Sequence, residues 1–358
     1  MAIFNKGIIL TQHKEPAFSQ PLVRFVNPGL DNMRIKGIEP RQIATIRSDD
    51  IIETAKIAKI VDEWDGKLLY RKLIRARENA IAVIADAVDD EPYVSSKINP
   101  LLNLKDEAIG GLELCKRVAK CEDAFIMIYK SVSGLDTPIP RSIHSVKMVR
   151  LHGGYPAVSN VSKLKLGEGR KLIVGVGALV HLYRAVTRCK PQSTVFTTVA
   201  GTCVANPMNL EVSIGMTVMQ VLEKCGLTTP PVRVVCGGPM TGISIFDPEK
   251  TLVTYTTRAV LAFKEDFKKI NYSCIGCGKC GKVCPVRLSP MYIHRFVENS
   301  YYRNIESFDA HMCIGCGTCS YVCPSKLSVA ESVKKAKAYA QSHFFAGENS
   351  EEEEVEEA

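Results

Sequence analysis

The sequence predicts a multidomain α/β protein that ends in a small helical domain. Two observations predict this fold class. Between residues 51 and 192, short apolar stretches typical of strands alternate with amphipathic stretches typical of helices, which indicates a mainly parallel sheet covered by helices. Towards the C-terminal end, one cysteine spacing occurs twice, and a helical pattern follows each copy.

Composition narrows the class of protein. The chain of 358 residues is long enough for two or three domains, with 46% hydrophobic and 23% charged residues. Because no apolar stretch could span a bilayer and the N-terminal residues lack signal-peptide features, we expect a cytoplasmic protein without direct membrane insertion. Fourteen cysteines in such a chain favour metal or redox chemistry. Scattered basic residues and the lack of a recognition motif argue against nucleic-acid binding.

The first 192 residues are predicted to form an arm and one domain. Residues 1–50 are expected to be an irregular N-terminal arm, because Pro16, Pro21, Pro28 and Pro40 interrupt any periodic pattern. Residues 51–192 are expected to form a Rossmann-like α/β domain. Its predicted helices are 50–64, 67–79, 105–119 and 181–188, and its predicted strands are 80–88, 124–129, 146–151 and 171–176.

The next segment differs in character. Residues 193–254 contain three short stretches rich in β-branched residues, at 193–201, 210–215 and 232–238, and one helical stretch at 217–225. The order strand, strand, helix, strand predicts a compact mixed α+β module.

The repeated spacing is Cys-x2-Cys-x2-Cys-x3-Cys-Pro. The first run comprises Cys274, Cys277, Cys280 and Cys284, and the second comprises Cys313, Cys316, Cys319 and Cys323. Three thiolates on a tight loop reach three corners of a cubane, and in two-cluster proteins the fourth cysteine of each run serves the other cluster. We therefore predict two 4Fe-4S clusters, with Cys323 completing the cluster of the first run and Cys284 completing that of the second.

Other uses of these thiols fit the spacing less well. Structural zinc takes four ligands per ion, usually as two separated pairs, and disulfides need less crowded cysteines. The cluster domain is expected to cover residues 255–346, with helices at 291–299 and 328–344 that keep water off the clusters.

Charge is distributed unevenly along the chain. The formal net charge is +8, although seven glutamates lie among the last eleven residues, so the rest of the chain carries about +15. A basic body could steer an acidic electron donor or acceptor to the clusters. The alternative is a solvated surface followed by a disordered acidic tail over residues 347–358.

With these motifs, the chain resembles the RnfC family, which supplies the C subunit of the Rnf electron-transport complex. The resemblance runs from about residue 50 to 345 and is strongest at TVAGTCVANPMNLEVSIG (198–215), VCGGPMTG (235–242) and CIGCGTCSYVCPSKLSV (313–329). It implies that the middle module is a β-grasp ligand-binding domain and that the last is a helical two-cluster ferredoxin domain. It also implies redox partners, namely another part of a reductase, a ferredoxin or a flavoprotein.

Members of that family hold FMN in a glycine-rich loop and take hydride from NADH. The corresponding stretch here, VDEWDGKLLYRKL (61–73), has Gly66 as its only glycine, whereas close backbone approach to a phosphate favours several. If flavin binds, the resemblance implies contacts from Glu91, Tyr93 and Gly177. Nearby Asp86, Asp89 and Asp90 would repel a phosphate unless they are paired.

These observations favour an iron-sulfur electron-transfer protein that relays electrons through two clusters to or from a partner oxidoreductase, without flavin. One alternative is an FMN-dependent NADH oxidoreductase that passes electrons to its own clusters. Another is a non-redox scaffold with structural clusters. Whether the chain is itself an enzyme stays open at the level of the sequence.

Overall fold

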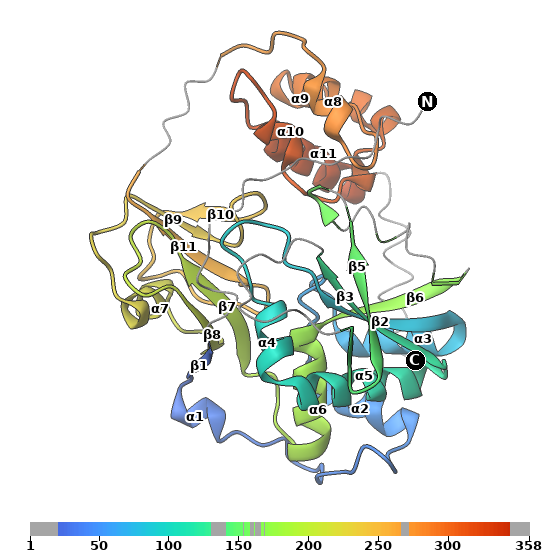
Figure 1. The fold of residues 1–358 in the computed structure, drawn as a ribbon. Coiled ribbons are helices and arrows are strands. Elements are labelled where there is room, and N and C mark those ends of the chain that lie inside the picture. Colours follow the sequence, from blue (N-terminus) through green and yellow to red (C-terminus); the bar gives the residue numbers. More distant parts are fainter. Residues whose placement is uncertain are drawn as a thin grey trace. The chain divides into compact units, whose positions relative to one another are not determined.

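The computed structural model describes residues 21–129, 141–152, 154–157, 161, 166–167, 169–265 and 272–343 (Figure 1). The chain divides into two compact units. The larger unit contains the described residues up to 152 and from 161 to 265, and the smaller contains 154–157 and 272–343. The predicted acidic tail and the first 20 residues of the predicted arm lie outside the described residues.

A five-stranded sheet forms the centre of the α/β domain. Its strands are β2 (Ala80–Ala87), β3 (Asp123–Tyr129), β4 (Ser142–Ile143), β5 (Val146–Leu151) and β6 (Arg170–Gly175), in the order β4-β5-β3-β2-β6. The strands β5, β3, β2 and β6 are parallel, and the short β4 joins β5 in the antiparallel direction. The predicted mainly parallel sheet is therefore present.

Helices cover this sheet. They are α2 (Ser48–Ile57), α3 (Leu69–Asn79), α4 (Ile98–Asn103), α5 (Lys105–Ala119) and α6 (Val176–Arg188). Helices α5 and α6 pack closely, because Gly111 leaves no side chain between them: a Cβ there would lie 2.1 Å from the carbonyl oxygen of Leu179. Apolar side chains from these helices and the sheet form one buried core.

Two predicted helix boundaries were wrong. The helix expected over 50–64 ends at Ile57, because Lys59 adopts a left-handed φ of +50° and Val61 then pairs with Leu68 across a tight loop. The helix expected to begin at residue 181 begins at Val176, directly after β6. Gly177 therefore lies in the first turn of α6.

A second sheet of six strands contains the predicted α+β module. Its strands are β1 (Leu22–Phe25), β7 (Thr194–Ala200), β8 (Met208–Ser213), β9 (Arg233–Cys236), β10 (Ile243–Ile245) and β11 (Ala259–Phe263), in the order β1-β8-β7-β11-β9-β10. Helix α7 (Val218–Cys225) packs on β7 and β11 and begins with a capping box between Thr217 and Gln220. We call this the β-grasp sheet.

Two strands of the β-grasp sheet lie outside the segment predicted for it. Strand β1 falls in the arm that was predicted to be irregular, yet it pairs in parallel with β8. Strand β11 falls in the segment predicted for the cluster domain, yet it lies between β7 and β9. For these residues the prediction was wrong, because their pairing partners lie far away in the sequence and no local turn signal marks them. A short helix, α1 (Pro28–Asp31), follows β1.

The smaller unit is helical. It contains α8 (Lys279–Val283), α9 (Pro290–Glu298), α10 (Thr318–Tyr321) and α11 (Val329–His343), with 3-10 turns η3 (Tyr302–Phe308) and η4 (Ala310–Met312). Short α8 packs on α10, and α9 packs on α11. Each cysteine run therefore contains one short helix and is followed by a longer one. Tyr155 also belongs to this unit, and its hydroxyl donates to the carbonyl oxygen of Cys316 at 2.7 Å. None of the helices in the described ranges is long and apolar enough to cross a bilayer.

A buried ionic network joins the β-grasp sheet to the α/β domain. The Glu211 side chain on β8 is 1% exposed and accepts hydrogen bonds from Arg184 of α6 at 2.6 Å and Thr194 of β7 at 2.9 Å. Its other oxygen accepts from Arg24 of β1 at 3.1 Å. Arg184 donates in turn to Glu107 of α5 at 2.6 Å. Burial opposes ionisation, but the charge and hydrogen bond of Arg184, together with smaller contributions from His181 and Arg24, outweigh it, and the pKa of Glu211 is lowered.

We expect Glu211→Gln to lower the free energy of unfolding of the larger unit by about 3 kcal/mol, because it leaves a buried guanidinium without its full counter-charge. Urea unfolding followed by the fluorescence of Trp64, the single tryptophan, measures this directly. Since the folded-state pKa of Glu211 is lowered, its contribution is present above the ordinary glutamate pKa. The difference from wild type should therefore shrink as the pH falls below about 4.

The exposed Glu53 on α2 provides the control. The variant Glu53→Gln should change the unfolding free energy by less than about 0.5 kcal/mol. If both substitutions changed the unfolding free energy equally, the ionic network would make no specific contribution to stability.

Candidate functional site

The two cysteine loops have the same backbone. Gly276 and Gly278 in the first run have φ of +69° and +68°, and Gly315 and Gly317 in the second have +68° and +75°. Glycine adopts this left-handed region without a steric penalty, and each loop then enters a short helix, α8 or α10. The repeated cysteine spacing is therefore accompanied by a repeated backbone conformation.

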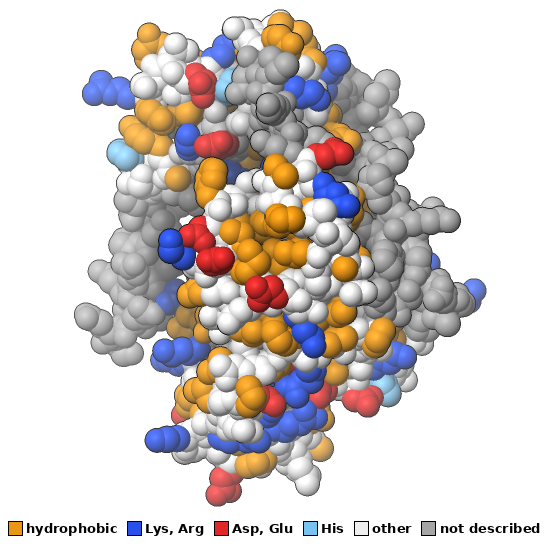
Figure 2. Space-filling model, turned by 90° about the vertical axis from the view of Figure 1, so that its left-hand side faces the viewer, with side chains coloured by type: hydrophobic (Ala, Val, Ile, Leu, Met, Phe, Trp, Pro, Cys, Tyr) orange, Lys and Arg blue, Asp and Glu red, His pale blue; other side chains and the backbone are white. Residues whose placement is uncertain are grey.

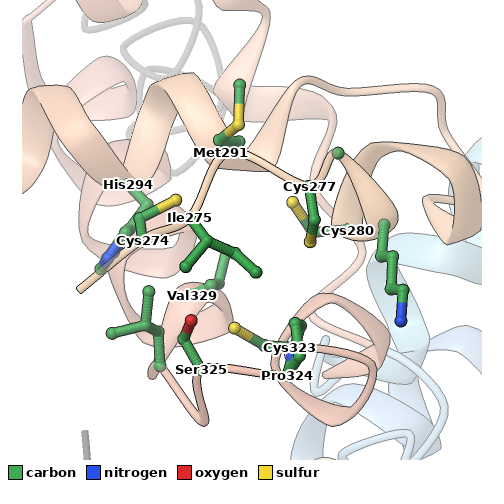
Figure 3. A pocket seen from close by; sticks show the side chains of 13 residues that line it. Cys274, Ile275, Cys277, Cys280, Met291, His294, Cys323, Pro324, Ser325 and Val329 are labelled. Carbon is green, nitrogen blue, oxygen red and sulfur yellow. The ribbon is translucent and has the colours of Figure 1, made fainter. Parts of the chain in front are cut away.

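Four thiols of the two runs line one hollow. Cys274, Cys277 and Cys280 come from the first run, and Cys323 comes from the second (Figure 3). These are the four residues that the spacing predicts for the first cluster. The arrangement supports the proposal that the fourth cysteine crosses over to the other run.

The remaining fourth cysteine lies beside the second run. Burial raises the pKa of Cys316, and the neighbouring Cys313 and Cys284 thiols raise it further. Burial also raises the pKa of Cys319 to about 12, with Cys316 and Cys313 adding to the effect. Crowded, buried thiols ionise readily only when a positive centre neutralises them, and cluster iron supplies that charge.

Hydrogen bonds reach several sulfurs. The amide of Gly315 donates to Cys313 Sγ, and that of Leu288 donates to Cys284 Sγ, both at 3.3 Å. The Thr318 hydroxyl lies 3.3 Å from Cys316 Sγ. Such bonds stabilise thiolate charge and raise cluster potentials. All fourteen cysteines are free of disulfides, and the thiols, glycine loops and donors together fit 4Fe-4S clusters.

The residues predicted as flavin contacts lie in the larger unit. Glu91 accepts hydrogen bonds from the amides of Met240 and Thr241, at 2.8 and 3.2 Å, and from the Thr241 hydroxyl at 2.5 Å. The ring of Tyr93 packs edge-on against Phe263 of β11 with centroids 5.7 Å apart. Both residues therefore fasten the α/β domain to the β-grasp sheet.

The third predicted contact, Gly177, is engaged by the chain itself. Its amide donates to Glu63 Oε1 at 2.5 Å, and the amide of Ala178 donates to Glu63 Oε2 at 2.9 Å. Burial, and then the neighbouring Asp62, raise the pKa of Glu63 to about 7. Glu63 thus caps α6 from the loop that corresponds to the flavin loop.

Neighbouring carboxylates are paired as well. Asp62 accepts from the amide of Gly175 at 2.9 Å and forms an ion pair with Lys72. Asp86 forms an ion pair with Lys97, and Asp89 accepts from the amides of Lys97 and Ile98, each at 2.9 Å. These carboxylates therefore form hydrogen bonds and ion pairs with other residues of the chain.

A groove of about 560 Å³ lies between the 63–66 loop and the β-grasp sheet. Trp64, Thr257 and Arg258 line it together with Ile243 and Ile245 of the edge strand β10. Hydrophobic side chains gather in the middle of the face shown in Figure 2, on the side of this sheet. The volume is within the usual range for small-molecule sites.

The residues present do not fit FMN. A flavin phosphate needs free backbone amides and glycines without side chains above them. Here the Glu63 carboxylate occupies that position: a Cβ on Gly175 or Gly177 would lie 2.3 or 2.9 Å from it. Glu91 fills a second glycine turn in the same way, 2.1 Å from a Cβ built on Gly238.

Two family models match parts of the chain. The model described as SLBB domain matches residues 196–244, and the one described as 4Fe-4S dicluster domain matches residues 273–327. The second match spans both cysteine runs, so the prediction of two 4Fe-4S clusters is confirmed.

The chain is also similar to curated proteins that are subunits of redox complexes. The chain is 26% identical over 245 residues to the C subunit of the Na(+)-translocating ferredoxin:NAD(+) oxidoreductase complex of Acetobacterium woodii, covering 64% of this chain and 55% of the relative. It is 27% identical over 249 residues to the C subunit of the ion-translocating oxidoreductase complex of Pseudomonas aeruginosa, covering 62% and 31%. The chain is similar in sequence to these C subunits. The predicted resemblance is confirmed, although the chain spans only a third to just over half of these relatives.

Solved structures share the fold. The NAD+-reducing NiFe hydrogenase in its H2-reduced state matches with a TM-score of 0.52 at 14% identity, covering 88% of this chain and 64% of the matched chain. The air-oxidized state matches with a TM-score of 0.50 at 16% identity, covering 87% and 57%. The predicted fold class is confirmed.

The sequence did not indicate the role of Glu63. The missing glycines of the 61–73 stretch marked a changed loop, but the partners of Glu63 lie 114 and 115 residues away. The sequence held one signal for this role, namely that the 61–73 stretch carries the Glu63 carboxylate where the family has a loop that lies at a helix N-terminus.

Crossed ligation can be tested with pairs of alanine variants. If Cys323 completes the cluster of the first run, Cys277→Ala/Cys323→Ala removes ligands of one cluster, and the protein should keep roughly half of its iron. The pair Cys316→Ala/Cys323→Ala should lose both clusters. Iron and sulfide analysis of anaerobically purified protein, with EPR spectra, provides the measurement.

Cys121→Ala is the matched control because Cys121 lies outside both runs, and it should keep all the iron. The reverse outcome, with the second pair keeping half of the iron and the first pair losing it, would mean that each run holds its own cluster.

Proposed function

We propose that this chain is an electron-transfer protein that relays electrons through two 4Fe-4S clusters to or from a partner oxidoreductase. The arrangement that carries the proposal is the hollow where Cys274, Cys277 and Cys280 of one run lie with Cys323 of the other. Relatives named as parts of ion-translocating oxidoreductase complexes support a role beside other redox proteins. In this proposal the larger unit carries the clusters, and the Glu63 and Glu91 side chains occupy the glycine turns where a flavin would bind.

The exposed rim of the first cluster loop suits a protein partner. Cys277 is exposed, and Ile275 and Tyr272 are 69% and 59% exposed. Lys279 and Lys282, also exposed, follow on α8. An apolar centre with basic neighbours favours a small acidic carrier such as a ferredoxin or flavodoxin, since complementary charge accelerates encounter.

A reducing compartment agrees with this role. None of the fourteen cysteines forms a disulfide, and a reducing compartment such as the cytoplasm keeps cysteines in that state. We therefore place the chain in the cytoplasm as part of the proposal.

Cofactor analysis of anaerobically purified protein tests the function. We expect about eight iron and eight sulfide per chain, EPR signals of two reducible clusters after dithionite treatment, and no flavin. Yellow, acid-releasable FMN whose colour is bleached by NADH would instead establish the alternative, an NADH oxidoreductase. Clusters that no biological carrier reduces or oxidises would leave only a structural role for them.

Charge reversal tests the docking face. We expect Lys279→Glu/Lys282→Glu to slow electron transfer from a small acidic ferredoxin by roughly tenfold at low ionic strength, measured by stopped-flow absorbance. The effect should fade towards 1 M salt, where the Debye length is about 3 Å. The exposed Lys36, in the other unit, gives the control Lys36→Glu, which should not alter the rate. Equal rates for all proteins at low salt would place docking elsewhere.

A further inference from the structure

The carboxylate of Glu63 lies where a bound anion commonly lies. Helix α6 has 13 residues, and its first amides have no partner within the helix. Those amides and the helix dipole favour a negative charge, which is why phosphates bind at such positions. Here the amides of Gly177 and Ala178 donate to one carboxylate of the chain itself.

A second feature beside Glu63 points to a ligand. A cavity of about 10 Å³, close to the space needed for one water, is lined by Glu63, Gly177, Ser96 and His181. Ser96 and His181 are 5% and 3% exposed, and neither Ser96 Oγ nor His181 Nε2 has a hydrogen-bond partner among the described residues. Buried polar atoms without partners cost about 1–3 kcal/mol each, so this cavity is better suited to a polar group than to apolar packing.

Glu63 borders both this cavity and the larger groove. Arg258 also lines both the small cavity and the 560 Å³ groove. Because Glu63 is shared by the two spaces, we expect its truncation to connect them. An entering oxyanion would then find the two helix amides, the Ser96 hydroxyl and the Arg258 guanidinium, which are donors that phosphate groups prefer.

We propose that the Glu63 carboxyl group fills a phosphate site at the N-terminus of α6, so that this site takes a phosphate-bearing ligand only when the side chain is removed. Its two oxygens accept the hydrogen bonds of the helix amides that a bound phosphate would otherwise accept. Because the Glu63 side chain occupies both the space and the amides, and repels an oxyanion when it is ionised, FMN and inorganic phosphate should not bind at the wild-type site. The inference does not depend on what the clusters do.

The test compares full-length wild-type protein with Glu63→Ala and Glu63→Gln. Inorganic phosphate is titrated against sodium chloride at matched ionic strength, and binding is read by equilibrium dialysis and by the thermal midpoint. FMN binding is read from the quenching of its fluorescence. We expect Glu63→Ala to bind phosphate and FMN at least about tenfold more tightly than wild type and to gain thermal stability in phosphate. Glu63→Gln, which still fills the space, should gain less.

The exposed Glu53 again provides a control, and Glu53→Ala should behave as wild type. A Glu63→Ala protein that folds only in phosphate would also support the proposal. Wild-type protein that binds phosphate or FMN as tightly as Glu63→Ala would overturn it. So would a variant that gains no phosphate binding, or one that fails to fold in either salt, because the carboxylate would then have only a structural role. Iron content, measured in parallel, separates these outcomes from any failure of the electron-transfer function.

Discussion

The buried carboxylate of Glu211 is the charge on which the larger unit depends. An ionised glutamate that is 1% exposed would cost several kcal/mol without partners, and Arg184 on α6 supplies the main one. Because Arg24 and Glu107 extend the same network, strands β1 and β8 and helices α5 and α6 are held in one arrangement. The position of α6 relative to the β-grasp sheet, and with it the position of the helix N-terminus, follows from this constraint.

Two further carboxylates of the α/β domain are held by internal partners, around α6 and the turn at Gly238. The Glu63 carboxyl group packs against the backbone of Gly175 and Gly177, and the Glu91 carboxyl group packs against the turn at Gly238. Glycines that would let a phosphate approach the backbone instead let a side chain approach it. The amides at these glycine turns are therefore satisfied by carboxylates of the chain itself. This agrees with a relay in which the clusters perform the redox chemistry and the larger unit carries them.

The smaller unit is built on a different constraint. Its apolar core is small, drawn from α9, α11 and the turns between them, and cysteines of both runs border it. Domains of this size commonly rely on metal centres for stability, because a single small core supplies little free energy. If the fourth cysteine of each run serves the other cluster, as the lining of the first hollow supports, then cluster assembly and folding of this unit are one process.

The sequence by itself determined the features that depend on short spacing. Cys274 to Cys284 and Cys313 to Cys323 lie within single loops, so their spacing already predicted the clusters, and the periodic stretches predicted α5 and β5 to the residue. Tertiary structure alone decided the rest. Strand β1 is defined by pairing with β8, the helix expected over 50–64 is cut short by a loop held at Asp62 and Glu63, and Glu63 meets Gly177 across 114 residues. The physical reason is that a hydrogen bond or ion pair between distant segments leaves no periodic pattern in either segment, and only the folded chain brings the partners together.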